Sequence, residues 1–310
     1  MAASGGTKAV LAALFANAGI AVAKFVGFLV TRSSSMLAES VHSLADSTNQ
    51  ALLLFGGRRA KRPATPEHPF GYARERYFWS FVVAMVLFAL GSAFALFEGI
   101  EKLRHPHEVK GLGWAIGILL FGIVLEGFSF RTAIVESNRV RGGASWRRFV
   151  RHTRHAELPV VLLEDLGALI GLVLALVAVV LAEVTGEPRW DGAGTVAIGL
   201  LLGVIAIVLA KEMKSLLIGE SAGRNDRAAI ESTIAGAPGV VGIEHLRTQH
   251  LGPDEILVAA KVRFDPGLDA EGVAAAIDDI ESRVRSAVPA VRPMYVEPAR
   301  AVVAEDPAGG

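Results

Sequence analysis

Cysteine is absent from this chain of 310 residues, and charged residues are scarce, at 20% of the total. Without cysteine the chain has no disulfide, no thiolate metal ligand and no thiol nucleophile. The hydrophobic content is 52% and the mean hydropathy is +0.45, which is too apolar for an ordinary soluble protein of this length. The composition therefore predicts a polytopic membrane protein.

Two kinds of motif that would indicate an enzyme are also missing. The sequence has no glycine-rich loop that cradles phosphates, which excludes an ATP-driven pump, and no His-Glu-x-x-His motif, which a membrane-embedded metallohydrolase commonly carries. We expect no enzymatic activity, no prosthetic group and no nucleic-acid partner. A membrane metal sensor or structural protein that transports nothing is the alternative, although it would not need acidic groups on two spans.

Six apolar stretches are long enough to cross a bilayer, for which a helix needs about 20 residues. They lie near residues 8–31, 34–57, 76–101, 111–136, 158–184 and 192–218. The connections after the second and fourth stretches are rich in Arg and Lys, which stay on the cytoplasmic side, so both ends of the chain are expected in the cytoplasm. The start is neither Arg-rich nor Ser-rich as transit peptides are, which favours a bacterial inner membrane.

The composition changes at Glu220, after which 15 acidic residues outnumber 9 basic ones and leave a charge of −6. The pattern there reads helix, strand, strand, helix, strand. This order predicts a small α+β domain, ferredoxin-like or metallochaperone-like, with both helices on one face of the sheet. We therefore predict an α-helical membrane protein with six transmembrane helices over 1–219, a cytoplasmic α+β domain over 220–300 and a disordered tail over 301–310.

Glu39, His42 and Asp46 interrupt the second apolar stretch. On a helix they fall within an arc of about 60°, and Asn49 extends the same face by another turn. Because each group would cost a few kcal/mol against lipid, this face must point into a helix bundle or a wet cavity. The imidazole and carboxylate of His42 and Asp46, at spacing i and i+4, can close on one divalent cation, and tetrahedral nitrogen and oxygen coordination favours zinc.

A partner pair lies in the fifth stretch, where Glu164 and Asp165 are adjacent. Neighbouring residues on a helix point about 100° apart, so both are not expected to bind one ion equally. We expect Asp165 to be the inward ligand, and Glu164 to be either a second ligand or a group that faces a neighbouring helix. Asp191, at the start of the sixth stretch, is predicted to be a helix-start residue. Other polar residues within the spans have no partner at ligand spacing: Asn17, Lys24, Glu98 and Glu126.

Four segments together resemble the cation diffusion facilitator family, in its branch related to zinc transporter nine: "LAESVHSLADSTNQALLLFG", "HPFGYARERYFWSF", "VVLLEDLGALIGL" and "GVVGIEHLRTQHLGP". The resemblance covers nearly the whole chain. It implies a homodimer, joined through the cytoplasmic domain, that exports divalent metal from the cytoplasm in exchange for protons by alternating access. Zinc is the first expectation for the ion, with manganese, iron or cobalt as alternatives.

The family pattern, applied to this sequence, implies that His42 and Asp46 are the ligands of the second span and Asp165 is a ligand of the fifth. Val161 stands where the family usually has a second histidine, so another group must complete the coordination shell. The groups considered for that place are Glu164, Glu39, Asn17 and water. A shell with more oxygen and less nitrogen weakens the preference for zinc relative to manganese, iron or cobalt.

Two secondary metal positions are predicted to be weak or absent. In the loop after the second span, Tyr72 stands where family members with a loop site often carry a histidine, so we expect His68 to be structural. In the cytoplasmic domain, Glu297 replaces a histidine of metal-loaded relatives, so a binuclear site is not expected. His250 with Glu297 from a sheet neighbour is the one pair there that could hold an ion.

Overall fold

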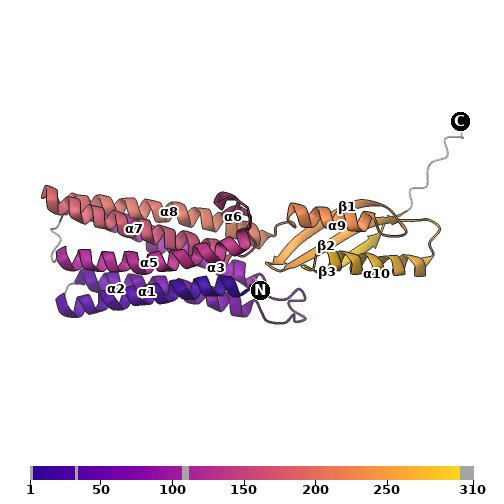
Figure 1. Cartoon of the computed structure of the whole chain (residues 1–310), viewed down its shortest axis with the longest axis horizontal. Helices are drawn as coiled ribbons and strands as arrows, with labels where there is room; N and C mark the ends of the chain where they lie inside the picture. The colour runs from indigo at the N-terminus through magenta and orange to yellow at the C-terminus, as the bar shows by residue number, and fades with distance from the viewer. Residues whose placement is uncertain (1–2, 32–33, 107–111, 301–310) are drawn as a thin grey trace, which may run out of the picture. The chain divides into compact units, whose positions relative to one another are not determined.

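The computed structural model describes residues 3–31, 34–106 and 112–300. The chain divides into two compact units, residues 1–62 with 74–217 and residues 63–73 with 218–310. The first unit is helical, and the second contains a small sheet (Figure 1). The loop 63–73, a connection between two spans in the sequence, therefore groups with the C-terminal part of the chain.

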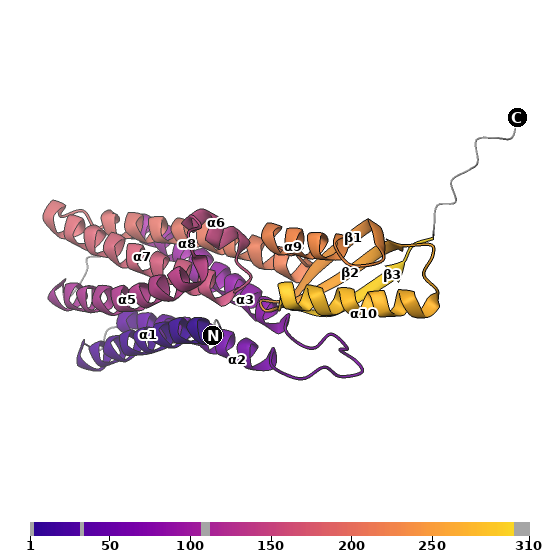
Figure 2. The same ribbon diagram turned by 45° about the vertical axis from the view of Figure 1, so that its right-hand side comes forward.

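The first unit is a bundle of long helices that run along one another (Figures 1 and 2). In the described residues its elements are α1 (Ala3–Thr31), α2 (Ser34–Arg59), α3 (Glu75–Val86), the π-helical segment η1 (Leu87–Ala93), α4 (Phe94–Arg104), α5 (Leu112–Arg141), α6 (Trp146–His152), α7 (Glu157–Thr185) and α8 (Arg189–Ile218).

Each of the six predicted spans coincides with a long helical stretch, but only five of these stretches are both long and apolar enough to cross a membrane in the part of the chain that is described. The five are Gly6–Gly27, Glu75–Arg104, Gly113–Arg141, Glu157–Thr185 and Arg189–Ile218. The helix α2 is not among them, because its sequence mixes Ser, Thr, Asn, Gln and ionisable residues with its apolar ones. A sixth span therefore stays a prediction.

Local sequence sets the ends of α7, the helix that carries the adjacent acidic pair. Pro159 lies in its first turn, where the missing N–H has no helical partner to lose. The helix ends at Gly186, whose φ of 67° is left-handed and favours glycine. These signals leave an uninterrupted apolar helix of 29 residues between them, and Glu164 and Asp165 lie within it.

The helices α4 and α8 approach each other closely through small residues. A Cβ added at Gly99 would lie only 2.7 Å from the backbone N of Val196. Nearby, in η1, the Ser92 hydroxyl donates a hydrogen bond to the carbonyl oxygen of Gly199 at 2.8 Å. Small residues that let backbones touch are a common means of helix association in membranes.

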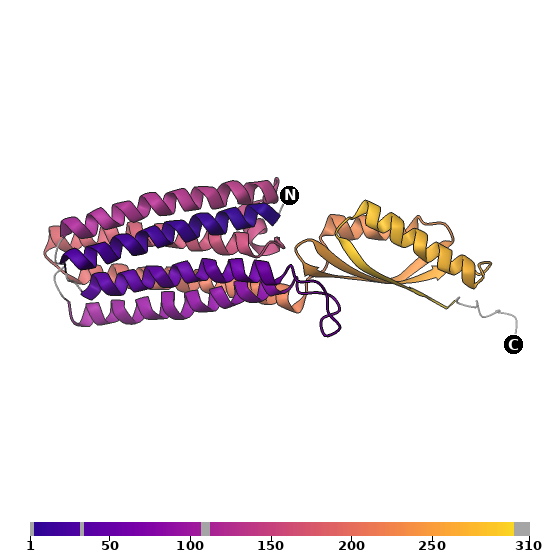
Figure 3. The ribbon, with the colours of Figure 1, turned by 90° about the horizontal axis from the view of Figure 1, so that it is seen from below.

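The second unit contains α9 (Arg224–Ala235), β1 (Val240–Gly252), β2 (Glu255–Phe264), α10 (Ala270–Ala287) and β3 (Val291–Pro298). The strand order is β1-β2-β3, with β1 antiparallel and β3 parallel to β2. Along β2, buried and half-buried residues alternate, and both helices cover the same face of the sheet (Figure 3). The predicted helix-strand-strand-helix-strand order is confirmed.

Candidate metal centre

Polar side chains gather inside the first unit, where α1 contacts α2, α5 and α7, and α5 contacts α7 (Figure 2). Burying such groups among apolar helices is costly unless they find hydrogen-bond or charge partners. The buried polar residues on these four helices include Asn17, Asn49, Gln50, Glu126, Ser129, Glu164 and Asp165.

Glu164 is 7% exposed and faces α2. The amide nitrogens Asn49 Nδ2 and Gln50 Nε2 donate hydrogen bonds to its two carboxylate oxygens, each at 3.0 Å. Asn17 Nδ2 on α1 donates in turn to Gln50 Oε1 at 3.4 Å. Of the two roles predicted for Glu164, these contacts correspond to the group that faces a neighbouring helix.

Asp165 is 1% exposed and turns toward α5. The hydroxyl of Ser129 donates a hydrogen bond of 2.6 Å to its Oδ2. A bond of this length is typical of a hydroxyl that donates to a carboxylate. Asp165 and Glu164 thus point to different helices, as expected for adjacent residues.

Glu126 has no partner at ligand spacing in the sequence, but in the structure it is buried where the charges of other carboxylates act on it. It is 3% exposed and lies on α5, one turn before Ser129. The charges of Asp46, Glu164 and Asp165 act on it, so it belongs to the same buried group. Its spacing of three from Ser129 within an apolar helix is the sequence signal that could have indicated this.

Asp46 is half-buried on α2, and its charge acts on both Glu126 and Glu164. His42 and Glu39 lie on the same helix, but their side chains fall outside the described residues. Within the described residues no three His, Asp or Glu side chains are arranged to hold a metal ion. The predicted pair of His42 and Asp46 therefore stays a prediction.

Among the described residues, acidic groups outnumber basic ones in this buried group. The charges of Asp46, Glu164 and Asp165 act on Glu126, and Lys24 of α1 is the cation that acts on it. Four ionised carboxylates and one ammonium group would leave a net negative charge in a medium of low dielectric constant. The arrangement is therefore suited to receive a cation or protons.

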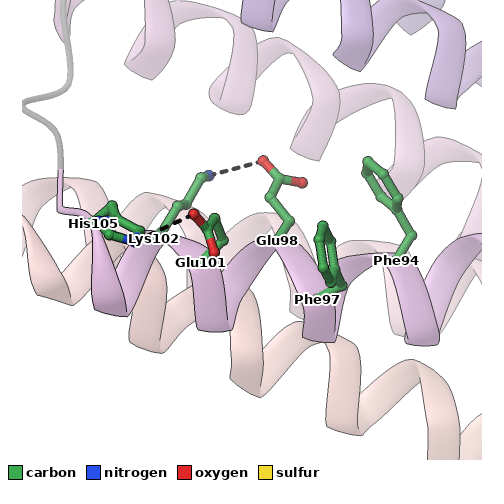
Figure 4. A pocket seen from close by; sticks show the side chains of 6 residues that line it. All are labelled: Phe94, Phe97, Glu98, Glu101, Lys102 and His105. Atoms are coloured by element: carbon green, nitrogen blue, oxygen red, sulfur yellow. Dashed lines mark ion pairs between the residues drawn. The ribbon is translucent and has the colours of Figure 1, made fainter.

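Several acidic residues elsewhere in the first unit have basic partners. Glu98, a further candidate from the sequence, pairs with Lys102 at 3.2 Å along α4, and Lys102 also pairs with Asp191 at 3.1 Å. Figure 4 shows Glu98 and Lys102 in a pocket that is lined by α4 alone, together with Glu101 and His105. These residues form ion pairs along a helix surface and lie outside the buried acidic group.

In the loop 63–73, His68 stacks on Tyr72 with their ring centroids 4.6 Å apart. The Tyr72 hydroxyl lies 3.4 Å from His68 Nδ1 and 3.3 Å from the hydroxyl of Thr65. These contacts order the loop locally, and the structural role expected for His68 stays a prediction.

The strand register separates His250 from Glu297 within one chain, which corrects the predicted pair. On β2, His250 lies opposite Ile256, whereas Glu297 lies opposite Lys261. Those positions are five residues apart, roughly 16 Å along a strand. Glu297 instead forms an ion pair of 3.1 Å with Lys261, and His250 Nδ1 lies 3.2 Å from the carbonyl oxygen of Gly252.

Comparison with known proteins identifies the family. Residues 10–218, more than half of the chain, match the model of the cation efflux transmembrane domain. The chain belongs to the cation efflux family. Residues 223–296 match the model of the cytoplasmic domain of cation efflux proteins. The predicted family is thus confirmed, and with its apolar helices this cation efflux chain is an integral membrane protein.

Several relatives of this cation efflux chain have names. It is 33% identical over 261 residues to the proton-coupled zinc antiporter SLC30A9, mitochondrial, of Xenopus laevis, and 30% identical over 260 residues to the Homo sapiens protein of the same name. Each match covers 83% of this chain but only 46% of the relative. The metal cation efflux system protein CzcD of Cupriavidus metallidurans is 24% identical over 267 residues, which cover 86% of this chain and 79% of CzcD.

Proposed function

We propose that this chain is a secondary transporter that exports divalent metal cations from the cytoplasm in exchange for protons, with zinc as the first substrate. The names of its relatives, a proton-coupled zinc antiporter and a metal cation efflux protein, support this class of activity. The proposal includes no chemistry on covalent bonds and no prosthetic group.

The observation that carries the proposal is the way the two acidic residues of α7 are held. Neutral amide and hydroxyl groups bind Glu164 and Asp165 in the middle of the bundle. Neutral donors orient a carboxylate without cancelling its charge. A divalent cation between α2 and α7 would supply the missing positive charge, and charge balance therefore favours cation binding at this place.

In the proposed site, Asp165 of α7 and the pair His42 and Asp46 of α2 are ligands, and Glu39 stays a candidate at the start of the same face. Imidazole and carboxylate ligands must be deprotonated to bind metal, so protons and metal compete for the same groups. Because Val161 supplies no nitrogen ligand, manganese, iron or cobalt are the alternative substrates.

The proposed topology has six spans, with α2 as the sixth, and both chain ends in the cytoplasm. The arginine-rich segment around α6, with exposed Arg147, Arg148 and Arg151, supports a cytoplasmic position for the connection between α5 and α7. A helix with a polar face, such as α2, can span a bilayer when that face is turned into the bundle.

The assembly is proposed to be a homodimer joined through the C-terminal domain, in a bacterial inner membrane. The match to the family's cytoplasmic domain supports the first part, and the CzcD relative from Cupriavidus metallidurans supports the second. Cross-linking of the full chain in membranes tests the dimer, and membrane fractionation of its source cells tests the location.

Proteoliposomes test the transport proposal. With the purified chain reconstituted, an acidic vesicle interior should drive uptake of external zinc, and an ionophore that dissipates the proton gradient should abolish this uptake. The same assay with manganese, iron and cobalt ranks the substrates. Zinc uptake that is indifferent to the proton gradient would refute antiport, and equal uptake by the His42→Ala and Asp46→Ala variants would refute the site.

A further inference from the structure

One atom of the buried group has no partner. The side chain of Asn49 is 2% exposed, and its Nδ2 donates to Glu164, but its Oδ1 has no hydrogen-bond partner among the residues that the structure describes. A buried acceptor left unpaired costs about 1–3 kcal/mol. Such atoms are rare in folded proteins, and each needs a physical explanation, for example a bound ion.

The orientation of the Asn49 amide follows from chemistry. The Nδ2 atom of Asn49 donates to Oε1 of Glu164, so the NH₂ group of the amide is the one that faces this carboxyl. The oxygen then points the other way. Asp46 lies one helical turn before Asn49 on the same face of α2, and its charge acts on Glu164. The unpaired oxygen therefore lies in the same buried region as these carboxylates.

Gln50, the next residue, provides a natural comparison. It is 0% exposed and also donates to Glu164, at the same distance of 3.0 Å. Its own oxygen, however, accepts a hydrogen bond from Asn17. Both ends of the Gln50 amide are thus used within the protein, whereas only one end of the Asn49 amide is used.

At one ligand position of the family pattern, this chain has a residue that cannot bind a metal ion. Val161, where a histidine is usual, is 0% exposed and packs in the apolar core of the bundle. A valine side chain has no atom that can bind a metal ion. A site between α2 and α7 therefore needs a ligand from another position.

We propose that Asn49 Oδ1 is a ligand of the transported metal, in place of the missing fifth-span histidine, and that Glu164 is a positioning residue. Glu164 holds the NH₂ group of Asn49 and so turns the carbonyl oxygen toward the ion. The inference rests on the proposed function, because it names a further ligand of that site. A neutral amide oxygen is a harder ligand than imidazole, so it favours manganese more than a histidine would.

Metal affinity tests the assignment with two matched variants. Asn49→Leu and Gln50→Met keep the approximate length of the side chains, and each removes one donor to Glu164. Zinc is titrated calorimetrically into the purified full chain in detergent. Loss of an orienting group typically weakens metal binding about tenfold to hundredfold, so Gln50→Met should lose about tenfold and Asn49→Leu at least about a further tenfold. Equal losses in the two variants would overturn the proposal.

The absorption spectrum of bound cobalt(II) gives a second readout, because it reports the ligand set directly. The Gln50→Met spectrum should match that of the wild type, and the Asn49→Leu spectrum should change. Asn49→Asp keeps an oxygen at this position and provides a readout if Asn49→Leu does not fold. It should still bind zinc, and an Asn49→Asp variant as weak as Asn49→Leu would count against ligation.

Asp165→Ala separates this inference from the proposed function. If Asp165→Ala binds zinc as the wild type does, the proposed site itself is wrong. If Asp165→Ala abolishes binding while Asn49→Leu and Gln50→Met behave alike, the site stands and only the role of Asn49 is refuted.

Discussion

Carboxylates in the middle of the helix bundle and carboxylates at the helix ends are stabilised by different kinds of partner. In the middle, Glu164 accepts hydrogen bonds from the amides of Asn49 and Gln50, and Asp165 accepts one from the hydroxyl of Ser129. These donors are neutral, so they fix the position of each carboxyl group without supplying a positive charge.

At the helix ends the partners are cations. Glu157, the first residue of α7, lies 3.3 Å from Arg76 of α3, and Asp191 near the start of α8 lies 3.1 Å from Lys102 of α4. Each of these carboxylates thus has a cationic side chain within the protein as its partner. Under the proposed function, this contrast separates acidic residues that serve the fold from those that would bind the transported cation.

The largest expected effect is that of Asp165→Ala. Removing this carboxylate should abolish proton-driven zinc uptake in proteoliposomes, because no other group of α7 takes its place. The matched control is Asp191→Ala, which removes an acidic residue with a cationic partner and should still transport zinc. If Asp165→Ala transports zinc at the wild-type rate, carboxylates in the middle of the bundle have no special role in transport compared with those at the helix ends.

The next effect concerns stability. Glu157→Gln leaves Arg76 without its anionic partner in a mostly buried place. Breaking a buried pair by removing one partner costs about 3–5 kcal/mol. We expect a lower unfolding temperature of the full chain in detergent, with an unchanged zinc affinity. A variant with normal stability and weakened zinc binding would show that Glu157 acts in the metal site.

Ser129→Ala should have a smaller effect on binding. It removes the donor that orients Asp165 but leaves the carboxylate, and loss of such an outer partner weakens metal binding by about tenfold. Calorimetric titration with zinc measures this change. Ser92→Ala, which removes a buried hydroxyl between η1 and α8, is the control and should bind zinc as the wild type does. Equal zinc affinities for Ser129→Ala and the wild type would mean that the Ser129 hydroxyl does not orient Asp165 for metal binding.

Glu297→Gln should have the smallest effect. Its partner Lys261 is 31% exposed, and an exposed ion pair contributes at most about 1 kcal/mol. The unfolding temperature and the number of zinc ions bound per chain should both stay at the wild-type values. One zinc ion fewer per chain would reveal a metal site in the C-terminal domain that the strand register does not suggest.

Signals local in the sequence predicted much of the fold. Apolar runs and turn residues located the helical stretches and the helix-strand-strand-helix-strand order, because both depend on neighbouring residues. The helical period also placed Asn49 on the same face as Asp46. Whether α2 crosses the membrane could not be decided in this way, because its composition is that of a helix buried on one side.

Partners on other helices were harder to predict. Glu126 has only Ser129 as a polar neighbour one turn away on α5, and the carboxylates that act on it, Glu164 and Asp165, come from α7. The sequence likewise left two roles open for Glu164, and it gave no reason to single out Gln50. In each case the deciding contact joins residues that are far apart in the chain.

The pairing of His250 with Glu297 failed for a related reason. Residue order places both on strands of one sheet, but it does not show which strand lies between them. Because β2 separates β1 from β3 and sets their registers, the two residues lie opposite positions of the central strand that are five residues apart. Sheet topology thus decides whether two potential ligands can meet.

Because the second unit includes the loop 63–73, it is not simply a C-terminal tail that could be removed from the first unit. Because the loop groups with residues 218–310, the chain passes between the units three times, after residues 62, 73 and 217. A methyl group added at Gly252 of β1 would lie 2.5 Å from the Cβ of Ala73, so loop and domain share a packed surface. Truncating the chain after α8 would expose that surface of the loop, directly beyond the end of α2.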